Sequence, residues 1–260
     1  DQREQAGAVV YIDEHRLDPE TKVFLRKPTS FDTLQRFCKV GVVGEREEVP
    51  VPPVQAVAVI AGCEYRHLDW TIDVDEESPT YGEVIHRTEM PIVGDELHHM
   101  GWNACSSCHD DEGMSRKYLI LPGVRSNSLH IVDTATDPRA PRLHKVIDGA
   151  EIKAKVDLSG PNTVHCLGSE IIISFLGNAK GEALGGYLHL NKEFEIQGRW
   201  ENSMGEIKFG YDFWYQPRHN IMVSSEWAAP NTFMPGFDLE EVGHLKYGRE
   251  LHFWNFEEKR

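Results

Sequence analysis

Apolar and polar residues alternate along this chain in short runs that recur at a regular interval. Four similar segments, each a β-rich run that closes with Asp or Asn, cover residues 70–75, 128–133, 186–191 and 250–255. Their closing residues lie 58, 58 and 64 positions apart. Asp and Asn close turns by bonding their own backbone. Each segment is therefore predicted to end at a hairpin turn, and a further apolar run follows the first three.

Another strand is predicted before each hairpin. Nearly continuous apolar runs, typical of strands buried on both faces, cover residues 56–60, 117–121, 170–175 and 220–225. A period of about sixty residues with three or four strands per unit is the pattern of a β-propeller. An irregular β-sandwich is the alternative, but it gives no reason for the interval. The fold is predicted to be all-β, and the best of its weak helix signals lies at residues 31–40.

The first fifty residues do not join the repeat. They are polar and mix charges, and they end in an acidic, Pro-rich stretch at residues 44–53 that is typical of a linker. We place a domain boundary near residue 54. Residues 1–53 are then an N-terminal extension, and residues 54–260 are a propeller domain of about three to four blades.

The composition of the chain argues against several classes of function. The chain has 260 residues, with 27 Lys and Arg against 42 Asp and Glu, so its net charge of −15 argues against nucleic acid or an anionic membrane as partner. No apolar run approaches the roughly 20 residues of a transmembrane segment. A disulfide framework usually has a higher density of cysteines and an even number of them, whereas this chain has five. Reduced thiols indicate a cytoplasmic protein, although a start without Met leaves an export signal open.

Four histidines lie at comparable places in successive units. His98 and His99 precede the predicted strand at 117–121 by one long loop, while His165 and His219 precede the next two strands. In a propeller such positions surround the central channel, so these imidazoles are expected to converge. Imidazole is the commonest ligand of Cu, Zn, Fe and Ni. All four histidines are candidate metal ligands; beside His219, Arg218 leaves an anion or carboxylate site as the alternative. Structural roles are expected for His86, His130, His144, His189 and His252.

Cysteines provide a second candidate group. Cys105 and Cys108 are separated by two residues, a spacing that suits a soft metal, a redox disulfide or, with His109, haem c. The surroundings lack a helical frame for haem, and a structural zinc site needs a second Cys pair. A redox or copper-handling dithiol and a pair of reduced thiols packed beside the histidines both remain open. Cys166 faces either the region of His165 or the opposite side, since neighbouring strand residues alternate.

The densest aromatic stretch covers residues 209–219, and residues 224–230 follow it. It is interpreted either as core packing between blades or as the wall of a pocket around the channel. In the second case Asp212 or Glu226 orients a ligating histidine. The residues assigned to this pocket or to its supporting shell are Trp102, Asp212, Trp214, Arg218 and Glu226.

Three long motifs stand out in the sequence. They are Asp95-Glu-Leu-His-His-Met-Gly-Trp-Asn-Ala-Cys-Ser-Ser-Cys108, Asp137-Pro-Arg-Ala-Pro-Arg-Leu-His-Lys-Val-Ile147, and Gly210-Tyr-Asp-Phe-Trp-Tyr-Gln-Pro-Arg-His-Asn220 with Ser225-Glu-Trp-Ala-Ala-Pro-Asn231. These motifs resemble the selenium-binding protein family, whose members include methanethiol oxidases. The resemblance implies a seven-bladed propeller and oxidation of methanethiol to formaldehyde, hydrogen sulfide and hydrogen peroxide. It also implies copper held by histidines.

By motif, the family's histidines carry over onto His98, His99 and His165, which the resemblance makes the catalytic candidates. Its last histidine comes from a C-terminal segment that this sequence does not contain. In animal members a selenium-associated cysteine closes the segment Ser-Pro-x-Tyr-Cys. Here the segment is Ser78-Pro-Thr-Tyr-Gly82, which puts covalent selenium binding there in doubt.

Family chains are also much longer, so the propeller is expected to be incomplete, with an unpaired edge and a metal site that lacks a ligand. Three functions follow from the sequence. The first is a copper-dependent, methanethiol oxidase-like enzyme whose substrates are a small thiol and oxygen. The second is a non-catalytic propeller that binds selenium or sulfur species or other proteins. The third is an inactive fragment.

Overall fold

The structure is a computed structural model, and it describes residues 40–43, 57–60, 68–75, 77–104, 115–205 and 207–260. It divides into two compact units, which are considered separately below. Unit 1 contains Asp1–Gly94 and Val132–His144, and unit 2 contains Asp95–Ile131 and Lys145–Arg260.

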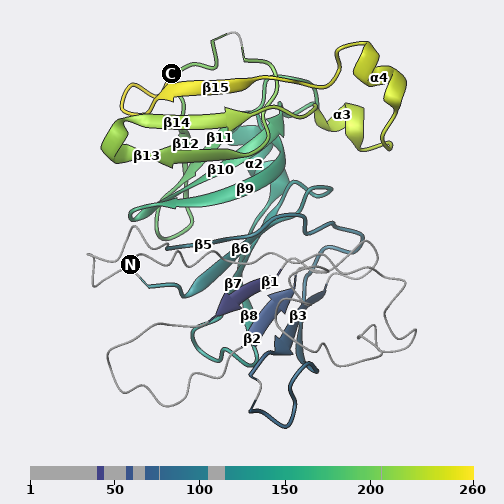
Figure 1. The fold of residues 1–260 in the computed structure, drawn as a ribbon, viewed down its shortest axis with the longest axis vertical. Helices are drawn as coiled ribbons and strands as arrows, with labels where there is room; N and C mark the ends of the chain where they lie inside the picture. Colours follow the sequence, from purple (N-terminus) through teal and green to yellow (C-terminus); the bar gives the residue numbers. More distant parts are fainter. Residues whose placement is uncertain (1–39, 44–56, 61–67, 76, 105–114, 206) are drawn as a thin grey trace. The chain divides into compact units, whose positions relative to one another are not determined.

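Four antiparallel sheets account for the described strands (Figure 1). Within each sheet the strands are neighbours in chain order, as in the blades of a propeller. The first sheet contains β1 (Val40–Val43), β2 (Val57–Ile60), β3 (Leu68–Asp73) and β4 (Val84–Glu89), and the second contains β5 (Gly101–Trp102), β6 (Tyr118–Pro122), β7 (Leu129–Asp133) and β8 (Arg142–Ile147). The third contains β9 (Ser159–Leu167), β10 (Glu170–Gly177), β11 (Gly186–Leu190) and β12 (Ile196–Arg199), and the fourth contains β13 (Phe213–Gln216), β14 (Ile221–Ser225) and β15 (Leu251–Asn255).

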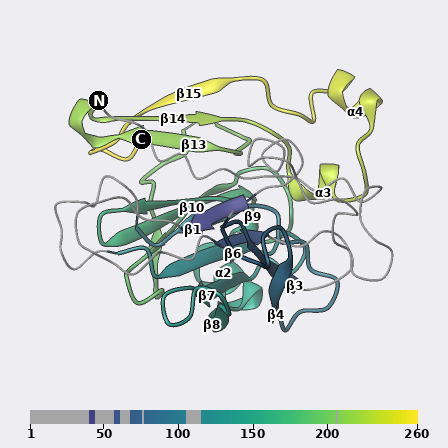
Figure 2. The same cartoon turned by 60° about the horizontal axis from the view of Figure 1, so that its bottom comes forward.

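Helices are few and short in the described residues. The 3-10 helix η3 joins β13 to β14, α2 follows β8, and α3 and α4 lie between β14 and β15 (Figure 2). Their bounds are α2 (Gly149–Val156), η3 (Pro217–His219), α3 (Pro230–Phe233) and α4 (Leu239–Gly243). None of the helices in this part of the chain has the length and apolarity that a membrane crossing requires.

The turns that close the repeated segments form as predicted. Asp or Asn at each closing position accepts a backbone N–H from a residue two to four positions further on. The closing residues are Asp75, Asp133, Asn191 and Asn255. The regular interval in the sequence therefore reflects one local event, the reversal of the chain after the third strand of each sheet.

The first strand of each sheet was missed by the sequence pattern. The apolar runs predicted as the strands before the hairpins are second strands, β2, β6, β10 and β14, and each is preceded by another strand that pairs with it. β5 has only two residues, and β9 opens with Ser159-Gly-Pro161. Such strands are too short or too rich in strand breakers to show an apolar period.

The domain boundary predicted near residue 54 lies inside the first sheet. β1 pairs antiparallel with β2, from Val40 opposite Ile60 to Val43 opposite Val57. Strand pairing therefore begins before the Pro-rich stretch that resembled a linker. Of the helix predicted at residues 31–40, Val40 begins β1, and the other residues lie outside the described part of the chain.

The core of unit 2 lies on both sides of β10. Ile171, Ile173 and Phe175 point into one cluster of buried residues, which also contains Ile120 of β6. Ile172 points into a second cluster, with residues of the third and fourth sheets. The second cluster contains Ile172, Tyr187, Trp200, Phe213, Met222 and Trp254. Burial on both faces explains why β10 is a continuous apolar run.

A short helix adds to the first of these clusters. Asp148 caps α2 by accepting a hydrogen bond from the Ala150 N–H at 2.6 Å. Ile152 and Val156, four residues apart on one face of the helix, are buried in the cluster. The helix ends at Asp157, which adopts a left-handed conformation.

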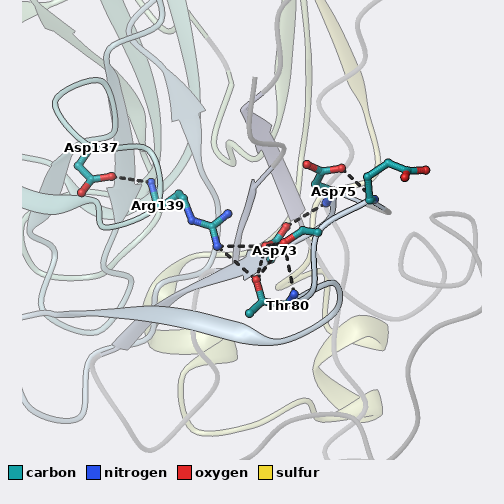
Figure 3. A network of polar contacts seen from close by, with 7 residues as sticks. Asp73, Asp75, Thr80, Asp137 and Arg139 are labelled. Atoms are coloured by element: carbon teal, nitrogen blue, oxygen red, sulfur yellow. Dashed lines mark hydrogen bonds and ion pairs between the residues drawn. The ribbon is translucent and has the colours of Figure 1, made fainter. Parts of the chain in front are cut away.

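A buried carboxylate organises unit 1 (Figure 3). Asp73, at the end of β3, accepts hydrogen bonds from Ser78 Oγ at 2.6 Å, Thr80 Oγ1 at 2.5 Å and Arg139 Nη2 at 3.1 Å. Burial alone would raise the pKa of Asp73, but these hydrogen bonds hold it below its usual value. The network ties the β3–β4 turn to the loop that carries Arg139. Gly82 closes the turn at φ +78°, a conformation that favours glycine.

Candidate functional site

The histidine pair lies on a segment that backbone hydrogen bonds fix against the end of β6. The His98 N–H donates to the Pro122 carbonyl at 3.3 Å, and the Val124 N–H donates to the Glu96 carbonyl at 2.9 Å. The buried carboxylate of Asp95 accepts the Ser126 N–H at 3.0 Å. The segment that carries His98 and His99 is therefore held by the end of β6 and by residues of the β6–β7 turn.

Glu96 orients His98. Its Oε1 atom lies 3.2 Å from His98 Nδ1, and Arg125 approaches its other oxygen at 3.4 Å. The hydrogen bond with His98, joined by Arg125, keeps the pKa of Glu96 below its usual range although the side chain is partly buried. The His98 and His99 rings meet edge to face with centroids 4.8 Å apart. A carboxylate on one ring nitrogen is the support that metal-ligating histidines usually have.

The strand after the histidine pair comes very close to β9. At Gly101, in β5, an added Cβ would clash with the carbonyl oxygen and side chain of Val164. Only glycine permits this approach. It places the first strands of the second and third sheets side by side, and His165 is the residue after Val164. Trp102, the other residue of β5, is partly buried.

His165 is surrounded by aromatic rings of the next sheet. Its ring centroid lies 4.9 Å from Phe213, 4.6 Å from Trp214 and 6.2 Å from Tyr215, each in an edge-to-face arrangement. Cys166 is buried on the other side of the strand, and its carbonyl accepts a hydrogen bond from the Tyr215 hydroxyl. The alternation of His165 and Cys166 follows from strand geometry, and it directs the thiol away from the histidine.

The fourth histidine lies at the surface. His219 and Arg218 are exposed residues of η3, the turn between β13 and β14. Asp212 is also exposed, and its Oδ1 accepts the N–H of its own neighbour, Phe213, at 2.7 Å. Trp214 is 71% exposed and contacts His165.

The structure does not gather the predicted histidines into a single group. Among the described residues, the one group of three His, Cys, Asp or Glu whose ligand atoms all lie within 4.8 Å of one another is Glu226, Glu250 and His252. Glu226 accepts the N–H groups of Arg249 and Glu250 at 2.8 and 3.1 Å, and its other oxygen lies 3.0 Å from His252. It thus orders the segment before β15 and pairs with a histidine of the hairpin motif.

Cys105 and Cys108 lie outside the described residues, so the roles predicted for them stay predictions. Three neighbours of the histidines were not singled out as individual residues, although two of them belong to the aromatic stretch at residues 209–219 that was interpreted as core packing or as a pocket wall. Glu96 had a local signal, since it lies two residues before His98. Tyr211, whose ring centroid is 6.1 Å from that of His99, and Tyr215 come from a distant part of the sequence, and only the packing of sheets brings them close.

Comparison with known proteins assigns the fold. The family model described as 56kDa selenium binding protein (SBP56) matches residues 37–260. The chain belongs to this family. The crystal structure of a hypothetical selenium-binding protein from Sulfolobus tokodaii is 39% identical and superimposes with a TM-score of 0.75, covering 81% of this chain and 48% of the other. The prediction of an all-β propeller is thereby confirmed, and the four sheets are its blades.

Curated relatives in the selenium-binding family carry two kinds of name. A methanethiol oxidase from Rattus norvegicus is 50% identical over 216 residues, which are 82% of this chain and 45% of the relative. A selenium-binding protein 2 from Arabidopsis thaliana is 48% identical over 222 residues, which are 84% of this chain and 45% of the relative. The chain thus spans about half the length of the curated relatives it matches.

Proposed function

We propose that this chain takes part in methanethiol oxidase-like chemistry, the oxidation of a small thiol by oxygen. The observation that best supports this proposal is the 50% sequence identity to a methanethiol oxidase over a region that includes the histidine pair. The balanced reaction takes methanethiol, oxygen and water to formaldehyde, hydrogen sulfide and hydrogen peroxide. The carbon loses two electrons, and oxygen gains them.

The histidine pair offers donor atoms that copper binds, although the three histidines proposed as ligands do not form one group in the structure. His98 and His99 offer two imidazoles whose rings are 4.8 Å apart, and the Glu96 carboxylate engages Nδ1 of His98. Imidazole suits copper and related transition metals. We assign His98, His99 and His165 as its ligands from this chain, with His219 as a further candidate. Bound copper would supply one-electron redox chemistry between thiol and oxygen.

The other side chains of the region have supporting roles. Glu96 fixes the ring orientation of His98, so that a ligand meets an imidazole that is already positioned. Trp214 and Phe213 cover the His165 ring with apolar surface, which limits the access of water. A thiol binds metals as the thiolate, and a dry surrounding strengthens the attraction of that charge to a cation.

Metal analysis of single variants tests this proposal. His98→Ala, His99→Ala and His165→Ala should each lower copper content at equilibrium by at least about tenfold, because each removes a ligand. Peroxide formed from methanethiol should fall with it. The matched control is His244→Ala, because His244 is exposed at the end of α4. Unchanged copper in all three variants would show that the ligands lie elsewhere.

The alternative function is binding of selenium or sulfur species without turnover. Relatives named selenium-binding protein, at 47% identity in Mus musculus and 48% in Arabidopsis thaliana, favour it. Incubation of the full chain with selenite, followed by mass spectrometry, separates the two functions. Selenium adducts on thiols without any peroxide from methanethiol would support the carrier and exclude the oxidase.

A further inference from the structure

A histidine in the third strand of three sheets faces a carboxylate. The pairs, with the distance between Nε2 and a carboxylate oxygen, are His130 and Asp95 at 4.0 Å, His189 and Glu170 at 3.0 Å, and His252 and Glu226 at 3.0 Å. Because the contact recurs with the repeat, a pair of histidine and carboxylate alone is explained by the fold. Any further role has to come from a feature that one sheet has and the others lack.

The fourth sheet has such a feature. Two residues before the histidine, on the same side of an extended chain, the second, third and fourth sheets carry Ser128, Tyr187 and Glu250. The fourth sheet thus places a second carboxylate beside its histidine. Glu226, Glu250 and His252 each offer one ligand atom, and these three atoms all lie within 4.8 Å of one another.

Glu226 is fixed before any ligand arrives. Its side chain is 8% exposed, and Oε2 accepts the N–H groups of Arg249 at 2.8 Å and Glu250 at 3.1 Å. An added Cβ at Gly248 would lie 2.5 Å from Oε2, so the glycine leaves the room that this carboxylate occupies. Oε1 is directed to His252 Nε2. A neutral Nε2 without a hydrogen and a carboxylate oxygen face each other only with a cation between them.

The two carboxylates also lack a cationic partner within the described part of the chain, where no Lys or Arg forms an ion pair with Glu226 or Glu250. Asp73 and Glu201, whose side chains are 0% and 2% exposed, each pair with an arginine instead. Two negative charges this close repel each other and attract a cation, and burial of one of them limits screening by water.

We propose that Glu226, Glu250 and His252 bind a divalent transition-metal ion of the zinc type. One imidazole nitrogen and two carboxylate oxygens suit such an ion, whereas soft ions prefer thiolates and Mg²⁺ prefers oxygen ligands alone. Three protein ligands leave a fourth, tetrahedral position for water. Glu250 is exposed, so an ion can enter from solvent. The bound ion would join the end of β14 to the start of β15, which lie side by side (Figure 1).

Zinc titration of the full chain by calorimetry tests the proposal. Glu250→Gln should weaken one zinc site at least about tenfold, because it removes a ligand and keeps the N–H that Glu226 accepts. The matched control is Glu170→Gln, which removes the carboxylate of the His189 pair and should leave zinc binding unchanged. The same loss should appear when His98 and His99 are both replaced by Ala, so the result does not depend on the copper ligands proposed above.

NMR of the histidine ring nitrogens guards against a variant that fails to fold. In the unchanged chain, zinc should shift the Nε2 signal that is missing from His252→Ala and present in His189→Ala. Zinc affinity that is unchanged in Glu250→Gln, an equal loss in Glu170→Gln, or zinc that leaves the His252 signal in place would overturn the proposal.

Discussion

The third and fourth sheets of unit 2 differ in what covers them. Along β10 every residue from Ile171 to Gly177 is buried, and successive side chains enter two separate cores. Along β14 and β15 buried residues alternate with partly buried or exposed ones, because one core lies on one side only. The same repeat thus gives β10, whose two faces are both buried, in the third sheet and β14, which has one buried face, in the fourth.

This difference indicates where the stability of unit 2 resides. A residue of β10 contributes to a closed core, so its loss leaves a cavity. A residue on the outer face of the fourth sheet contributes little to the fold of a single chain, and its apolar surface becomes useful in contact with another sheet. Three measurements follow, beginning with the one that tests this difference most directly.

Truncation of matched phenylalanines should give the largest effect. Phe175→Ala removes a fully buried ring from β10, and we expect it to lower the free energy of unfolding by about 3–5 kcal/mol. Phe253→Ala removes a ring that is 70% exposed, and we expect a change within about 0.5 kcal/mol in dilute solution. Urea unfolding followed by circular dichroism measures both. Equal losses in the two variants would contradict the comparison.

Hydrogen exchange should show a smaller but related difference. Backbone amides of β10 are expected to exchange only when unit 2 unfolds as a whole, whereas those of β15, at the edge of the fourth sheet, open locally. We expect protection at least about thirtyfold higher in β10, which corresponds to about 2 kcal/mol. Mass spectrometry of native-state exchange measures this. Helix α2, which packs on the first core cluster, serves as an internal reference and should behave like β10.

The pH dependence of stability should give the smallest effect. His130, in β7, is completely buried, and its burial lowers its pKa although Asp95 lies 4.0 Å away and acts in the opposite direction. Unfolded histidine takes up a proton near pH 6.5. Below that pH the unfolded chain binds more protons than the folded one, so stability should fall on acidification, by at most about 1.4 kcal/mol per pH unit.

His130→Asn should flatten this part of the pH profile. The difference between the variant and the unchanged chain at pH 8, where the imidazole is neutral in both states, measures the packing lost by the substitution. Subtracting it isolates the titration of His130. A profile between pH 7 and 5 that keeps its slope in the variant would show that other groups determine the acid response.

The sequence predicted the repeat well because Asp75, Asp133, Asn191 and Asn255 act locally, within their own turns. It missed β5 because two residues carry no period, and it missed β1 because that strand is also short. The histidines could be chosen as candidate metal ligands from their motifs. The individual ring contacts around them could not be predicted, since Tyr211 and Phe213 approach His99 and His165 only through the packing of different sheets.

Because β10 packs into two cores, it also constrains which insertions and deletions this chain can accept during evolution. Ile172 and Ile173 are adjacent residues that belong to different cores. Insertion or deletion of one residue within β10 would reverse the direction of every side chain beyond it, so both cores would lose their contacts at once. Changes in length should therefore accumulate in the loops between sheets. The alternation of side chains along β10 therefore fixes which residues pack into each of the two cores.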